Sequence, residues 1–112
     1  MSATLFESPN EIPVPTLTTY DGAAIDHYHK ECAAYISAVS AWCRANTKSK
    51  SDLVGMLYRF PYADGYAQYV VLNTKPLQLV HLNCGDGWHM PDVVRRGLKL
   101  SDIKAGARRV NS

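Results

Sequence analysis

The sequence of 112 residues contains no apolar run of about 18 residues, the length that a membrane-spanning helix needs. Its start shows neither the basic part nor the apolar part of a secretory signal, so we expect no such signal. The net charge of +2 is too small to mark a nucleic-acid-binding surface by itself. With 46% apolar and 20% charged residues, the chain does not fit the disordered class either. These absences leave one small folded domain.

Common catalytic and nucleotide-binding motifs are also missing, among them Gly-x-Gly-x-x-Gly, the Walker loop, Gly-x-Ser-x-Gly and His-Glu-x-x-His. The three cysteines are Cys32, Cys43 and Cys84, and without a Cys-x-x-Cys pair they fit neither a disulfide framework nor a zinc ribbon. On one helix, Cys32 and Cys43 would lie about 16 Å apart and could not form a disulfide. We interpret these two as buried core thiols and expect a reducing, cytoplasmic location.

The clearest pattern in the chain is an amphipathic stretch that runs from Ala23 to about Asn46. Its apolar residues recur at spacings of three and four, which predicts a helix with one buried face. Asp21 and Gly22 form a turn signal before it, and a polar run over residues 46–51 ends it. The predicted buried face consists of Ile25, Tyr28, Cys32, Tyr35, Ile36, Val39, Trp42 and Cys43.

Extended segments follow this helix. Leu53–Phe60 and Tyr66–Leu72 flank the hairpin signal Asp64-Gly65, and Leu77–Asn83 forms a third strand that we expect to be covered on both faces. Val93-Val94 would add a short edge strand. The predicted fold is therefore α+β, with one long amphipathic helix packed on a three- to four-stranded antiparallel sheet.

The two ends of the chain differ in structure and in charge. Residues 1–20 contain Pro9, Pro13 and Pro15 and predict an extended N-terminal arm, followed by a single domain over residues 21–112. Ser101 would be the N-cap of a short C-terminal helix. Residues 1–31 carry five acids and one base, whereas residues 92–112 carry six bases and two acids. These opposite charges would attract each other within the fold or between two subunits.

Aromatic residues are numerous, with seven tyrosines, two tryptophans and two phenylalanines. Four tyrosines cluster around the predicted hairpin. They would line an apolar pocket, form a dimer face, or pair across strands to stabilise the sheet. The ligand or interface candidates are Tyr58, Tyr62, Tyr66, Tyr69 and Trp88.

A second candidate site lies between residues 79 and 89, where His81, Cys84, Asp86 and His89 fall within nine positions. These side chains could bind a zinc-like ion or supply a thiol nucleophile with a histidine base. Their spacing matches no closed zinc site, and no third group is present to orient the base. We therefore favour a structural turn at Gly85-Asp86-Gly87, and we assign no metal and no cofactor.

The segments Lys75–Trp88 and Arg96–Ile103 resemble the C-terminal half of small uncharacterised bacterial proteins of mobile elements, of the plasmid, prophage or integron gene-cassette type. The resemblance covers residues 52–105. It implies a mobile-element context, and it assigns no activity and no catalytic residue.

Three functions follow as hypotheses. The favoured one is a small cytoplasmic binding or interaction domain, homodimeric through its aromatic sheet face or edge strands, with a protein or small molecule as ligand and without enzymatic activity. The first alternative is a metal-binding or hydrolytic enzyme that uses the cluster from His81 to His89. The second alternative is that the basic C-terminal segment binds nucleic acid or phosphate. Asp92 and Asp102 interrupt the positive charges of this segment, which makes nucleic-acid binding the less favoured of the two.

Overall fold

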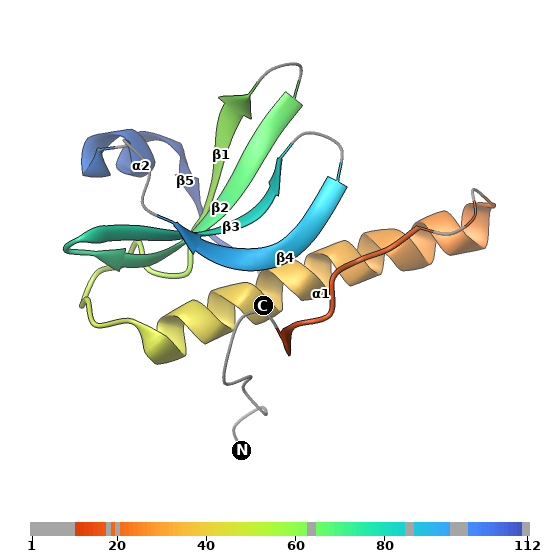
Figure 1. Cartoon of the computed structure of the whole chain (residues 1–112), viewed down its shortest axis with the longest axis horizontal. Helices are drawn as coiled ribbons and strands as arrows, with labels where there is room; N and C mark the ends of the chain where they lie inside the picture. The colour runs from red at the N-terminus through yellow and green to blue at the C-terminus, as the bar shows by residue number, and fades with distance from the viewer. Residues whose placement is uncertain are drawn as a thin grey trace.

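The structure is a computed structural model that describes residues 11–17, 19, 21–62, 65–84, 87–94 and 99–110. A long helix is followed by an antiparallel sheet, which confirms the predicted α+β class (Figure 1). Over the described residues the sheet has five strands in the order β4-β3-β2-β1-β5. The elements are α1 (Gly22–Asn46), β1 (Leu57–Tyr62), β2 (Gly65–Thr74), β3 (Leu77–Cys84), β4 (Gly87–Val94), α2 (Leu100–Gly106) and β5 (Ala107–Arg108).

Helix α1 begins and ends where its sequence pattern predicts. Asp21 is the N-cap, and its Oδ1 accepts a hydrogen bond from the backbone N–H of Ala24 at 2.9 Å. Only the second half of the helix is buried, however, at residues such as Tyr35, Val39 and Cys43. The first half extends beyond the sheet (Figure 1), and Ile25 is only half-buried. The prediction of a buried face along the whole helix is therefore wrong for its first turns.

Two apolar clusters lie on the two faces of the sheet. The first packs the second half of α1 on the sheet and includes Val39, Cys43, Val70 and Leu82. Ile12 of the predicted arm is 2% exposed and belongs to this cluster, so the described part of the arm is packed into the domain. The second cluster joins the other sheet face to α2, and its members include Tyr58, Tyr69, Val71, Leu79 and Ile103.

Strand β3 contributes to both clusters. Leu79 belongs to the cluster under α2, while Val80 and Leu82 belong to the cluster under α1. All three side chains are at most 1% exposed. The prediction that this strand is covered on both faces is confirmed.

Several boundaries differ from those expected. Strand β1 begins at Leu57 instead of residue 53, because Gly55 has a φ of +84° and interrupts the extended backbone. Strand β4 has eight residues, although only its last two were predicted. Helix α2 has Lys99 as its N-cap residue, and Ser101 lies inside the helix. The Asp102 carboxylate accepts a hydrogen bond from the backbone N–H of Lys99 at 3.0 Å, which explains the earlier start.

Candidate functional site

The predicted aromatic candidates separate into buried and exposed residues. Tyr58 and Tyr69 are directly opposite each other on β1 and β2, and they are 8% and 4% exposed. The ring of Tyr69 also stacks on His81 of β3, with 4.8 Å between ring centroids. These two tyrosines therefore hold strands together inside the second cluster. Tyr66 is 57% exposed, while the side chains of Tyr62 and Trp88 lie outside the described residues.

The candidate cluster between residues 81 and 89 is described in part. His81 is buried in β3 at 8% exposure, and its backbone partner is Asp92 of β4. Cys84 ends β3 and His89 lies within β4, but their side chains and all of Asp86 lie outside the described residues. Among the side chains that are described, no three His, Cys, Asp or Glu residues are placed to hold a metal ion. The convergence of this cluster stays a prediction.

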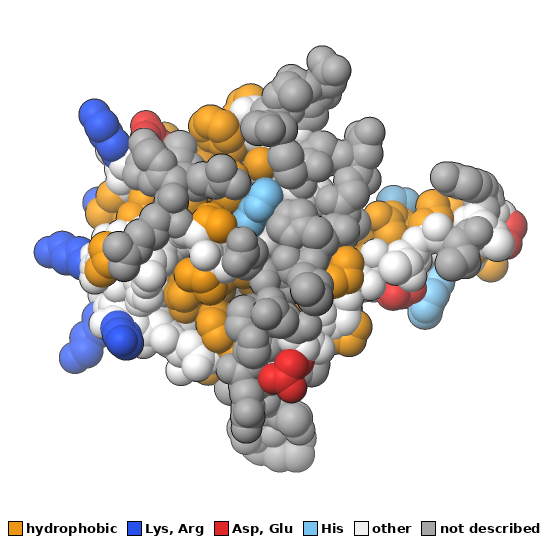
Figure 2. Space-filling view, viewed as in Figure 1, with side chains coloured by type: hydrophobic (Ala, Val, Ile, Leu, Met, Phe, Trp, Pro, Cys, Tyr) orange, Lys and Arg blue, Asp and Glu red, His pale blue; other side chains and the backbone are white. Residues whose placement is uncertain are grey.

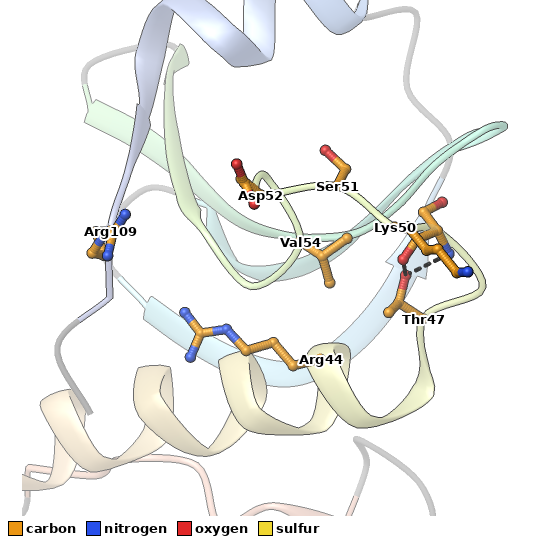
Figure 3. A pocket seen from close by; sticks show the side chains of 8 residues that line it. Arg44, Thr47, Lys50, Ser51, Asp52, Val54 and Arg109 are labelled. Carbon is orange, nitrogen blue, oxygen red and sulfur yellow. Dashed lines mark hydrogen bonds between the residues drawn. The ribbon is translucent and has the colours of Figure 1, made fainter.

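The structure reveals a different site, which we call the basic pocket. It is a cavity of about 390 Å³ at the C-terminal end of α1, between this helix, the segment 47–54 and the residue that follows β5 (Figure 3). Arg44 and Val54 lie in its middle, with Arg109 at one end and Lys50 at the other. Its lining residues are Arg44, Thr47, Ser49, Lys50, Ser51, Asp52, Val54 and Arg109.

Gly55 leaves room for the Arg44 side chain at the basic pocket. A Cβ atom on Gly55 would lie only 2.6 Å from Nε and 2.9 Å from Cγ of Arg44, so the arginine side chain packs directly over the glycine. The buried hydroxyl of Ser40 donates to the Gly55 carbonyl at 2.7 Å, and the Gly55 N–H donates to Val71 of β2 at 2.8 Å. Arg44 is thus held against a loop that is hydrogen-bonded to both α1 and β2.

The segment after α1 is anchored to the sheet through Asn73, whose Oδ1 accepts hydrogen bonds from the Lys48 N–H at 2.7 Å and the Thr47 hydroxyl at 3.0 Å. Ser49 is held in the same way, because its Oγ accepts a hydrogen bond from the N–H of Thr74 at 3.0 Å. These bonds order the wall of the pocket before any ligand arrives.

Two serine hydroxyls on this wall act as hydrogen-bond acceptors. The Oγ of Ser49 accepts from Thr74, and the Oγ of Ser51 accepts from the N–H of Leu53 at 3.2 Å. Since each oxygen already receives an amide hydrogen, its own hydroxyl hydrogen can point to a ligand. The wall therefore offers O–H donors beside the cationic side chains.

The positive charges of the basic pocket are not paired within the described part of the chain. There, no carboxylate lies within 4.0 Å of Arg44, Lys50 or Arg109, whereas His27 and Glu31 form an ion pair in the first half of α1. Three cationic side chains and one carboxylate, Asp52, line the cavity. An arrangement of this kind favours an anion.

Sequence reasoning missed this site because its residues come from three separate segments. The run over residues 46–51 indicates the end of the helix, and Arg109 falls within a basic tail. The available signal was a hydroxyl-rich and lysine-rich run directly after a predicted helix that carries Arg44 near its end.

The comparisons of this chain with known proteins identify no relative. No protein-family model, no curated protein and no solved structure matches the chain. Among the described residues, no helix is long and apolar enough to span a membrane. The predicted mobile-element context stays a prediction.

Proposed function

We propose that this domain binds a phosphorylated small molecule through the basic pocket. The observation that carries the proposal is the set of three cations, Arg44, Lys50 and Arg109, that line one cavity and have no acidic partner within the described residues. Guanidinium groups match the geometry of phosphate oxygens and bind them with two parallel hydrogen bonds. The serine hydroxyls on the wall would add further donors.

The size of the cavity supports a ligand larger than a bare ion. Its volume of about 390 Å³ lies within the range of about 300–1,000 Å³ that is typical of small-molecule sites. Val54 is 7% exposed and contributes an apolar surface between the charged ends of the pocket. The proposal keeps the predicted role of a binding domain and gives it a site and a ligand class.

Calorimetric titration with methyl phosphate at low ionic strength tests the proposal. Arg109→Gln and Arg44→Gln should each weaken binding about 10-fold or more, as expected for the loss of a hydrogen bond between charged groups. Arg108→Gln is the matched control, because it removes the same charge from the neighbouring exposed residue of β5, which does not line the cavity. Failure of the unmodified protein to bind methyl phosphate, or an equal loss in the Arg108 variant, would overturn the proposal.

We also propose that the domain forms a homodimer, as the sequence predicts, and that contacts between opposite charges contribute to it. Asp26 and Glu31 lie on the half of α1 that extends beyond the sheet, together with Lys30 and two histidines, so the two acids and one base leave a formal charge of −1 there when the histidines are neutral. Lysine and arginine side chains gather at the opposite end of the molecule (Figure 2). Since the two ends are far apart within one chain, a second copy is the partner whose basic end fits this acidic half.

A further inference from the structure

The basic pocket contains a group that a site for phosphate alone would not need. Asp52 is the carboxylate among the lining residues, and it lies across Val54 from Arg44 (Figure 3). Within the described part of the chain it forms no ion pair with the cations of the pocket. A carboxylate near a phosphate dianion lowers its affinity through repulsion between like charges. Asp52 therefore weakens the binding of a simple phosphate ester.

A carboxylate in this position favours a ligand that carries a positive charge beside its phosphate. The ammonium group of such a ligand would meet Asp52, while the phosphate would meet Arg44 and Arg109. Val54 lies beside these groups in the pocket (Figure 3), and a short aliphatic linker can pack against its side chain. The pocket thus combines cationic side chains, one carboxylate and an apolar side chain, which together are the complement of a small zwitterion.

We propose that the ligand of the basic pocket is an aminoalkyl phosphate, a phosphate monoester whose alkyl chain ends in an ammonium group. This inference rests on the proposed function, because it assumes that the pocket binds phosphate. Asp52 is then a specificity-determining residue. It accepts hydrogen bonds from the ammonium group and disfavours phosphate esters that lack one.

Two ligands with the same anionic group test the inference, 2-aminoethyl phosphate and ethyl phosphate. Calorimetric titration at low ionic strength should show that the unmodified protein binds the amino compound about two- to fivefold more tightly, the range expected for an exposed ion pair. In Asp52→Asn this preference should disappear, and ethyl phosphate should bind more tightly than to the unmodified protein. Arg109→Gln should weaken both ligands by the same factor and keep the preference.

Glu11→Gln is the matched control, because it removes one exposed carboxylate that does not line the pocket. It should change neither affinity nor preference. A third ligand, 2-hydroxyethyl phosphate, separates charge from hydrogen bonding, and binding as tight as that of the amino compound would overturn the ammonium assignment.

The remaining outcomes separate this inference from the proposed function. If neither phosphate ester binds, the proposed function fails and the inference fails with it. If ethyl phosphate binds in an Arg109-dependent way but the amino compound is not preferred, or Asp52→Asn keeps the preference, the ligand class is wrong and the phosphate site stands.

Discussion

Replacing Gly55 by alanine should destabilise the fold and weaken phosphate binding at the same time. At a φ of +84°, a residue with a Cβ atom costs about 1–2 kcal/mol more than glycine. The new Cβ would also lie 2.6 Å from Nε of Arg44 and 3.0 Å from the buried Ser40 hydroxyl, so both side chains must shift. We expect the free energy of unfolding to fall by about 1–3 kcal/mol.

Urea unfolding followed by fluorescence measures this change. With an m-value of about 2 kcal/mol per M, the midpoint should fall by about 1 M for a loss of about 2 kcal/mol. Gly22→Ala is the matched control, since a Cβ at this first residue of α1 meets nothing within 4 Å. It should leave the midpoint unchanged or raise it by up to about 0.5 M, which corresponds to a gain of about 1 kcal/mol in the free energy of unfolding. If Gly55→Ala is as stable as the control variant, our account of the loop is refuted.

Further expectations concern titration, the helix cap and self-association. Burial raises the pKa of the Cys43 thiol to about 12, so as the pH rises the unfolded chain loses this proton before the folded protein does. The free energy of unfolding should therefore fall as the pH is raised above about 9. Denaturant unfolding at a series of alkaline pH values should show a shallower fall for Cys43→Ala. The hydrogen bond from the Ala24 N–H lowers the pKa of the Asp21 carboxyl group. The ionised carboxylate therefore stabilises α1 at pH values above the ordinary aspartate pKa of 3.8, and this stabilisation is lost in acid. Circular dichroism near pH 7 should show less helix for Asp21→Ala than for the unmodified protein, and equal helicity would contradict the role of Asp21 as the helix cap. Sedimentation should show a dimer that 0.5 M salt weakens, because the Debye length there is about half its value at physiological ionic strength. A strict monomer at high concentration and low salt would contradict the proposed dimer.

The long helix and the central strands could be predicted because their patterns are local. Helix α1 shows an uninterrupted spacing of three and four, and the signal at Asp64-Gly65 separates β1 from β2. Strand β4 gave no such signal, because Pro91 lies inside it and its pairing with β3 shifts register between His81 and Asn83. The two-residue strand β5 is too short to have a pattern, and its pairing with β1 depends on where α2 ends.

The basic pocket could not be predicted for a different reason. Arg44 and Arg109 are 65 positions apart, and only the packing of the chain after α2 brings them to one cavity. The run over residues 46–51 has a composition typical of a solvated helix end, and the sequence does not show that Asn73 binds its backbone. Long-range hydrogen bonds of this kind leave no periodic trace in a sequence.

The extension of α1 beyond the sheet divides this helix into two parts of unequal stability. Its second half is fixed by apolar contacts with the sheet, whereas its first half has few buried side chains to oppose the entropy of the coil. Fraying should therefore start at Gly22 and stop near Tyr35, where the core begins. The first half of α1 can thus become more or less helical when a partner binds to it, while the second half and the basic pocket at its C-terminal end stay in place.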